Sequence, residues 1–321
     1  MLKDSFTIGG KTIYISEGML TLSYLDIKDI LKLEELKEYT WLSGLSFSFN
    51  KISEIRGLDC FAPNLKELHL SYNLISEIEG LDSLISLKEL CLESNKLAEI
   101  RGLDALVNLE VLYLMGNELI EIRGLSKLRN LKELVLNFNL IEQIGGLEHL
   151  QNLEWLALRG NRISEIVGLE NLTNLRELDI SENYLTKIAG LNSLVKLERL
   201  SLSHNQIKKI SGLENLTNLK ELCIDHNLIT EITGLESLVN LEHIDLRYNQ
   251  IAEIKGFENL KKLEWLDISG QKDNAPREII QKLGGLSSVG YALQPQEFVN
   301  YLRRVSQKNY KKKNKLLSNL G

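Results

Sequence analysis

Leucines and other apolar residues recur along the chain at a spacing of 22 residues. One copy begins at Leu87 and follows the pattern LxxLxLxxNxIxxIxGLxxL. An asparagine holds the ninth position of ten copies, and one longer step of 23 residues, from Asn50 to Asn73, coincides with an extra residue near Pro63. A fixed period of this size is typical of repeat architectures, so the pattern predicts a solenoid of about eleven turns.

Each position of the repeat has a physical reason. In the LxL segment, apolar and variable residues alternate with the period of a β-strand, so the leucines should point inward and their neighbours outward. The asparagine follows where the chain turns beside a packed core, and its amide can satisfy backbone groups that would otherwise be buried unpaired. The later glycine suits a bend that a side chain would obstruct. We therefore expect an α/β solenoid shaped as a horseshoe, with a parallel sheet on its concave face and short helical or irregular convex segments.

Both ends of the chain depart from the repeat and are predicted to cap it. A hairpin is expected from Phe6 to Ile15, and a short amphipathic helix from Asp26 to Lys37. Two later prolines mark helix starts, which predicts helices over Pro276–Leu283 and from Pro295 to about Lys308. The predicted parts are an N-terminal cap (1–41), the repeats (42–271), a helical C-terminal cap (272–308) and a basic flexible tail (309–321).

Charge is distributed unevenly along the chain. The formal net charge is −6, yet residues 298–321 carry seven Lys or Arg residues and no acid, which leaves 31 basic against 44 acidic residues elsewhere, or −13. Because binding to a duplex depends on cations that neutralise phosphates, no nucleic acid is expected on the main surface.

The sequence also suggests a compartment. We find no apolar stretch long enough for a membrane helix and no secretory signal, so stable membrane insertion is not expected. The three cysteines show no metal-binding or disulfide spacing, which fits a reducing compartment. We expect a monomeric cytoplasmic protein without a cofactor.

The stretches SHNQIKKISGLENLTNLKELCI and NRISEIVGLENLTNLRELDI carry a family resemblance most plainly. Over residues 42–271 the chain resembles the 22-residue leucine-rich-repeat class, which includes the regulatory subunit of protein phosphatase 1 and the bacterial internalins. Since no export signal is visible, the regulatory-subunit type is the closer analogue. That resemblance implies a concave face that grips a folded protein, for which a phosphatase and a small GTPase are both considered.

The variable positions of the strands, at repeat positions 3, 5, 7 and 8, are the expected partner contacts. In the middle turns they form an apolar and aromatic cluster with an arginine at its edge, typical of a binding hot spot. Later turns are acidic with aromatics, which suits a basic partner surface, although exposed strand positions also tolerate such residues without any partner. The predicted partner-binding residues are Tyr113, Met115, Val135, Phe138, Trp155 and Arg159, followed by Asp179, Asp225, Asp245, Tyr248 and Trp265.

Several other patterns do not indicate a site. Gly9 to Thr12 resembles the end of a phosphate-binding loop, but a strand is expected to follow it where the motif needs a helix. Three histidines, His204, His226 and His243, lie near Asp225 and Asp245 on neighbouring turns. Ligands on adjacent parallel strands point the same way, so we expect no metal there.

No arrangement of nucleophile, base and acid stands out from the repeat background, so an enzyme is the least favoured class. The sequence predicts a non-catalytic scaffold or regulatory subunit that binds a folded protein on its concave face. The alternative is a structural or self-associating module held at an acidic membrane surface by the basic tail.

Overall fold

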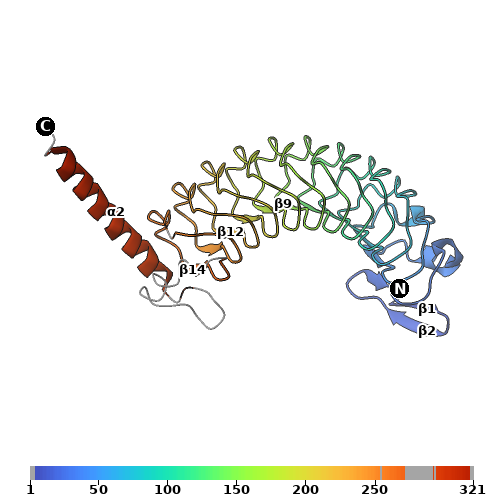
Figure 1. Cartoon of the computed structure of the whole chain (residues 1–321). Helices are drawn as coiled ribbons and strands as arrows, with labels where there is room; N and C mark the ends of the chain where they lie inside the picture. Colours follow the sequence, from blue (N-terminus) through green and yellow to red (C-terminus); the bar gives the residue numbers. More distant parts are fainter. Residues whose placement is uncertain (1–3, 254, 272–291, 293, 319–321) are drawn as a thin grey trace. The chain divides into compact units, whose positions relative to one another are not determined.

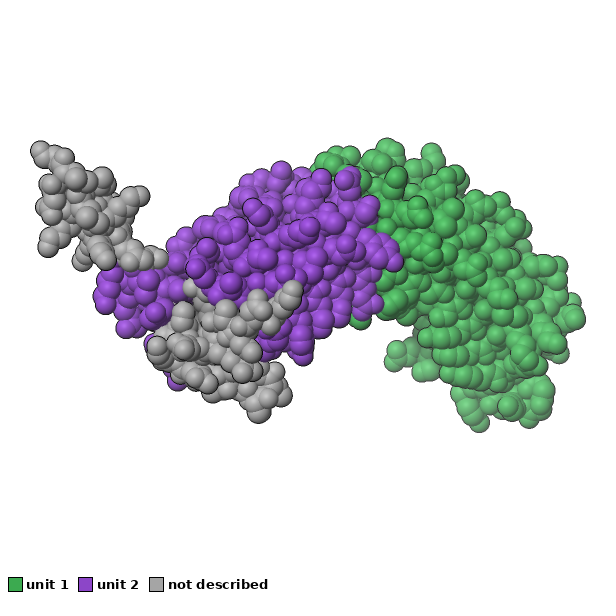
Figure 2. Space-filling model, viewed as in Figure 1, with its two compact units in different colours: residues 1–163, 167–175 green, residues 164–166, 176–321 purple. Residues whose placement is uncertain are grey.

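The structure is a computed structural model that describes residues 4–253, 255–271, 292 and 294–318. The chain divides into two compact units, residues 1–163 with 167–175 and residues 164–166 with 176–321 (Figure 2). We describe each unit by itself. The predicted helix Pro276–Leu283 lies outside the described residues.

The first unit begins with a hairpin of two antiparallel strands, β1 (Ser5–Ile8) and β2 (Lys11–Tyr14). Phe6 of β1 packs edge-on against the ring of Tyr39, with ring centroids 5.5 Å apart. The hydroxyl of Tyr39 donates a hydrogen bond to the backbone oxygen of Ser5 at 2.7 Å. These contacts fasten the hairpin to the segment that precedes the repeats.

The helix predicted over Asp26–Lys37 does not form. Two short 3-10 helices, η1 (Ile30–Lys32) and η2 (Glu34–Glu38), take its place. The reason lies in the repeat, because the side chain of Asn50 accepts hydrogen bonds from the backbone N–H groups of Leu25 and Ile27 at 3.1 and 3.0 Å. These bonds hold the start of the segment against the neighbouring turn, and Leu33, between η1 and η2, has φ of −93° and ψ of 64°, which is not helical.

One strand per turn forms a parallel sheet of twelve strands whose order follows the chain. The strands of the first unit are β3 (Met19–Thr21), β4 (Gly44–Ser46), β5 (Glu67–His69), β6 (Glu89–Cys91), β7 (Val111–Tyr113), β8 (Glu133–Val135) and β9 (Trp155–Ala157). Those of the second are β10 (Glu177–Asp179), β11 (Arg199–Ser201), β12 (Glu221–Cys223), β13 (His243–Asp245) and β14 (Trp265–Asp267). The predicted solenoid with a parallel sheet is therefore confirmed (Figure 1).

The array starts earlier than predicted. Strand β3 pairs with β4, and Leu20 and Leu22 are fully buried, so the turn at Met19 already belongs to the sheet. The predicted N-terminal cap therefore supplies the first strand of the sheet. That first turn carries Leu25 at the place of the repeat asparagine, so the most regular column of the pattern is missing there.

Buried leucines and asparagines hold the turns together. The central residue of each strand from β3 to β14 is at most 2% exposed, and the ten repeat asparagines are between 3% and 9% exposed. Nδ2 of Asn95 donates to the backbone oxygens of Leu70 and Leu92, at 3.0 and 3.1 Å, so it joins its own turn to the preceding one. This is the role that the repeat predicts.

The returning segments are irregular rather than helical. After the first turn, which holds η1 and η2, the described returning segments contain one short 3-10 helix, η3 (Asp59–Phe61), in the turn with the extra residue. A glycine with positive φ interrupts the segment in the ten successive turns from Gly57 to Gly256, and at Gly102 φ is +73°. There a Cβ atom would lie 2.0 Å from the backbone oxygen of Ile78, so the preceding turn leaves no room for a side chain.

The second unit ends with helix α2 (Pro295–Ser318). Val299 and Leu302 are buried, and Nε2 of Gln296 donates to the backbone oxygens of Leu260 and Leu263 at 3.2 and 2.8 Å. The helix begins at the predicted proline but continues ten residues beyond Lys308, so residues 309–318 are helical and not the predicted flexible tail. Lysine and leucine favour helices, and the segment contains no glycine or proline to end one.

Candidate partner-binding face

We call the side chains at repeat positions 3, 5, 7 and 8 the outward face of each unit. In the first unit this face holds the predicted aromatic cluster. Phe138 is 47% exposed, Arg159 is exposed, and Tyr113, Met115 and Trp155 are half-buried. Val135, by contrast, is 8% exposed, so it offers a partner little surface and is corrected to a supporting residue.

Phe138 is held in place by its neighbours on the next turn. Its backbone lies in the left-handed region, with φ of 54°. A Cβ atom on Gly160 would lie 2.5 Å from Cδ1 of Phe138, so this glycine leaves the space that the ring occupies. The guanidinium carbon of Arg159 lies 5.6 Å from the ring centroid, within the range of a cation–π interaction. The exposed ring is therefore ordered before any partner arrives.

Tyr113 lies on β7, and its hydroxyl donates a hydrogen bond to Oε2 of Glu133 at 2.9 Å. Burial, together with this hydrogen bond and the nearby carboxylates, raises the pKa of Tyr113. The phenol consequently stays protonated and remains a hydrogen-bond donor at neutral pH.

The aspartates of the second unit are less free than the sequence suggested. Asp245 is 5% exposed and accepts hydrogen bonds from Nε and Nη2 of Arg247, the latter at 2.7 Å. Asp225 is 7% exposed and contacts the Ser203 hydroxyl and Nδ1 of His226. A partner would meet these aspartates as members of internal networks and not as a bare acidic rim.

The other predicted residues of the second unit lie on its outward face. Asp179 is half-buried and accepts hydrogen bonds from the backbone N–H and the hydroxyl of Ser181, at 2.9 and 2.5 Å. Trp265 on β14 is half-buried, whereas Tyr248 is 53% exposed.

Two rows of neighbouring aromatic rings at position 8 were not predicted from the sequence. In the first unit Tyr24, Phe49 and Tyr72 stack with centroids 4.4 and 4.2 Å apart. In the second unit His204 and His226 stack with centroids 4.0 Å apart, and the ring of Tyr248 lies tilted against that of His226 at 4.3 Å. All six residues have positive φ, which aligns their rings from turn to turn. The sequence does contain a signal for them, because aromatic residues hold the position before the repeat asparagine in successive turns.

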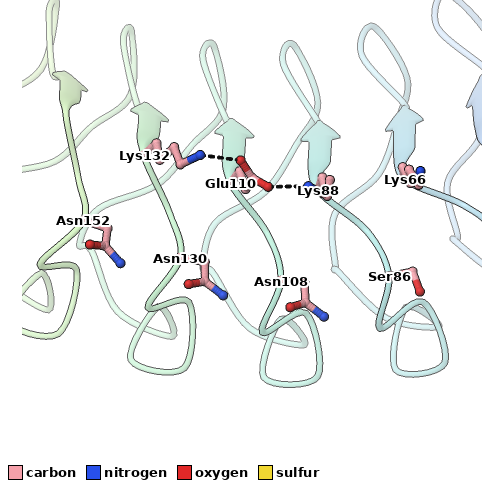
Figure 3. Close-up of a pocket in the computed structure, with 8 residues that line it drawn as sticks. All are labelled: Lys66, Ser86, Lys88, Asn108, Glu110, Asn130, Lys132 and Asn152. Atoms are coloured by element: carbon pink, nitrogen blue, oxygen red, sulfur yellow. Dashed lines mark hydrogen bonds and ion pairs between the residues drawn. The ribbon is translucent and has the colours of Figure 1, made fainter.

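A charged ladder runs along position 2, beside the strands. Oε1 of Glu110 accepts a hydrogen bond from Nζ of Lys88, and Oε2 accepts one from Nζ of Lys132, both at 2.6 Å (Figure 3). The hydrogen bonds from these lysines lower the pKa of Glu110 to about 2. Glu198 of the second unit is bound in the same way by Arg176 and Lys220, also at 2.6 Å.

A second asparagine column, also missed, lines the groove next to this ladder, with Asn108, Asn130 and Asn152 on successive turns (Figure 3). Each donates to a backbone oxygen 23 residues earlier, as Asn108 does to Ile85 at 2.9 Å. The ladder and this column join neighbouring turns, so we assign both a structural role.

Two side-chain triads have potential metal-ligand atoms within 4.8 Å of one another in the described part of the chain: His204, Asp225 and His226, and His69, Glu89 and Cys91. Neither His243 nor Asp245 joins the first of them. Ligand atoms from neighbouring strands do therefore converge, contrary to the argument from strand direction. The second triad was not foreseen, although His69 and Cys91 hold the same repeat position on successive turns.

Comparison with known proteins places the repeats in a family. The model of leucine-rich repeats in two copies matches residues 40–83, 63–105, 107–149, 151–193 and 195–237, and a model of the leucine-rich repeat matches residues 217–272. No curated protein matches the sequence.

Several solved structures share the fold. Internalin InlF from Listeria monocytogenes is 24% identical, with 79% of this chain and 81% of that chain covered and a TM-score of 0.65. A chain in the octameric complex of Latrophilin 3, Unc5D and the leucine-rich repeats of FLRT2 is 21% identical, with 86% and 89% covered and a TM-score of 0.66. YopM from Yersinia enterocolitica is 29% identical, with a TM-score of 0.58; the match covers 73% of this chain and 48% of YopM.

Among the described residues, no helix combines the length and the apolar character that a membrane crossing needs. The two family models together cover residues 40–272, well over half of the sequence, and the protein belongs to the leucine-rich repeat family.

Proposed function

We propose that the protein is a non-catalytic scaffold or regulatory subunit that binds a folded protein through the outward face of its first unit. The observation that carries this proposal is the ordered exposure of Phe138. Phe138 is 47% exposed, and its backbone lies in the left-handed region. Its ring occupies the space beside Gly160, with the guanidinium of Arg159 over it. A large apolar ring held in water does not stabilise the fold by burial, whereas aromatic and arginine side chains dominate binding hot spots.

Neighbouring side chains extend this surface. Trp155 and Tyr113 are half-buried at strand positions 3 and 5, so they lose little conformational freedom when a partner covers them. In the second unit Tyr248 and Trp265 are the matching aromatic candidates, beside aspartates that are already hydrogen-bonded. We assign them a supporting role in partner contact.

The comparisons support the class of function. The structural relative with FLRT2 was solved in a complex with other proteins, which agrees with a fold used for protein binding. In line with the resemblance to the phosphatase regulatory subunit, we further propose a cytoplasmic location and a phosphatase or a small GTPase as the partner.

Site-specific photo-crosslinking in source cells tests the proposal. A photoreactive residue at Met115, on the outward face, should capture a discrete protein partner. The same residue at Ile120, which is 58% exposed in a returning segment, is the matched control and should not capture it.

The captured protein is then purified and titrated against variants. Replacing both Phe138 and Trp155 by alanine should raise the dissociation constant about 700-fold, because each hot-spot truncation costs about 2 kcal/mol and the two together cost about 4 kcal/mol. Ile120→Ala should leave binding unchanged. Unchanged binding in the double variant, together with a collapse of its thermal midpoint, would show that these residues serve the core and not a partner.

A second candidate rests on helix α2. It is continuous over Pro295–Ser318 and includes all seven basic residues of the C-terminal segment, and a basic helix suits an acidic membrane surface. Pelleting with phosphatidylserine vesicles, with and without residues 306–321, tests this role. Pelleting that depends on this segment and is lost at high salt would favour it, and absence of pelleting would remove it.

A further inference from the structure

The outward face of the first unit carries a triad of donor atoms that the proposed function does not use. His69 on β5 and Cys91 on β6 are register partners in adjacent parallel strands, and Glu89 lies two residues before Cys91 on the same face. Nε2 of His69 lies 3.3 Å from Oε1 of Glu89, and Sγ of Cys91 lies 3.5 Å from the same oxygen. All three ligand atoms lie within 4.8 Å of one another.

We propose that His69, Glu89 and Cys91 bind one zinc ion. Zinc is bound tetrahedrally by imidazole, carboxylate and thiolate at about 2.0–2.3 Å, so its ligand atoms lie about 3.3–3.7 Å apart. The two separations that involve Glu89 match this spacing in the absence of an ion. Three protein ligands leave the fourth position for water at the outward face.

The hydrogen bonding of the triad is incomplete without a cation. Nε2 of His69 is buried and has no hydrogen-bond partner, because its contact with Glu89 lacks the geometry of a hydrogen bond. A buried nitrogen without a partner is costly, and a metal ion would satisfy it. The triad among His204, Asp225 and His226 differs, since Asp225 is already hydrogen-bonded to Ser203 and His226, and the two imidazole rings are stacked.

The surrounding charge also favours a cation. Carboxylates of Glu67 and Glu93 lie near the thiol, and burial together with these carboxylates raises the pKa of Cys91. A divalent ion would replace the thiol proton and offset the negative charge that the neighbouring acids impose.

The chain contains its own control. Glu221 and Cys223 repeat the Glu-Leu-Cys sequence of β6 on β12, but the register partner of Cys223 is Ser201, where the first site has His69. Cys91 therefore has an imidazole at its register position on the preceding strand, whereas Cys223 has a serine hydroxyl there.

Titration of the reduced full-length protein with Co²⁺ alone tests the site, because a thiolate–cobalt bond gives a charge-transfer band in the near ultraviolet. The wild type should bind one equivalent with this band, and Zn²⁺ should displace it. Cys91→Ser should abolish the band, and His69→Gln should weaken affinity by at least about tenfold. Cys223→Ser should change neither, and circular dichroism checks that all variants fold.

Three results would overturn the proposal: a wild type without the band, a band that survives in Cys91→Ser, or a band lost in Cys223→Ser. Cobalt bound without a thiolate band would assign the metal to other ligands and would likewise overturn it. None of these readouts involves a protein partner, so the zinc site and the proposed function succeed or fail separately.

Discussion

Oδ1 of Asn117 accepts a hydrogen bond from the backbone N–H of Leu97, twenty residues earlier, at 3.0 Å. Nδ2 of the same side chain donates to the backbone oxygens of Leu92 and Leu114, both at 3.0 Å. One buried side-chain amide thus provides hydrogen-bond partners for three backbone groups from two turns. Because each turn of a solenoid contacts only its neighbours, such links carry much of the stability of the array.

Replacing Asn117 by alanine should therefore lower the free energy of unfolding by about 2–4 kcal/mol, since three buried backbone groups lose their partner. The measurement is urea unfolding followed by circular dichroism. Asn108→Ala is the matched control, because Asn108 is exposed and its side chain donates one hydrogen bond to the backbone oxygen of Ile85; it should cost about 1 kcal/mol or less. Equal losses in the two variants would contradict the linking role of the buried column.

The glycine column makes a second prediction. Gly102→Ala should lower the free energy of unfolding by about 2 kcal/mol or more, because alanine disfavours a positive φ and its Cβ would overlap the backbone oxygen of Ile78. Gly145→Ala serves as the control, since a Cβ atom there would meet nothing within 4 Å and its φ is not positive. Thermal unfolding of both variants decides the matter, and a stable Gly102→Ala protein would refute the steric argument.

The leucine and asparagine columns were enough to predict the sheet, because each of these residues has one physical role and recurs in every turn. Prediction failed where a residue's role depends on its neighbours. Leu25 replaces the asparagine in the first turn, where Asn50 binds the backbone of Leu25 and Ile27, and the helix expected after it is interrupted at Leu33.

The candidate face shows the same division. Strand alternation predicted that Tyr113, Phe138 and Trp155 lie on the outward face, as the structure places them. Alternation could not predict that Val135 is covered, because this depends on the size of side chains in adjacent turns. Nor could it predict the convergence of His69 with Cys91, which needs the strand register and both side-chain directions.

The charged ladder of the first unit makes stability depend on pH. Glu110→Gln should lower the free energy of unfolding at pH 7 by about 1 kcal/mol, since two half-exposed ion pairs with Lys88 and Lys132 contribute little each. The pKa of Glu110 is lowered from 4.5 to about 2 in the folded chain. A carboxyl with a lowered folded-state pKa stabilises the fold above its unfolded pKa and loses this contribution as the pH falls through the folded one.

The difference between wild type and Glu110→Gln should therefore be full above about pH 5 and shrink toward zero near pH 2. Urea unfolding of both proteins across this range measures it. Asp104→Asn removes an exposed acid of the same unit for which no ion pair is found among the described residues, so its effect should stay near zero at every pH. A difference that persists unchanged at the acid end would mean that Glu110 acts through packing, and that Lys88 and Lys132 do not hold its charge.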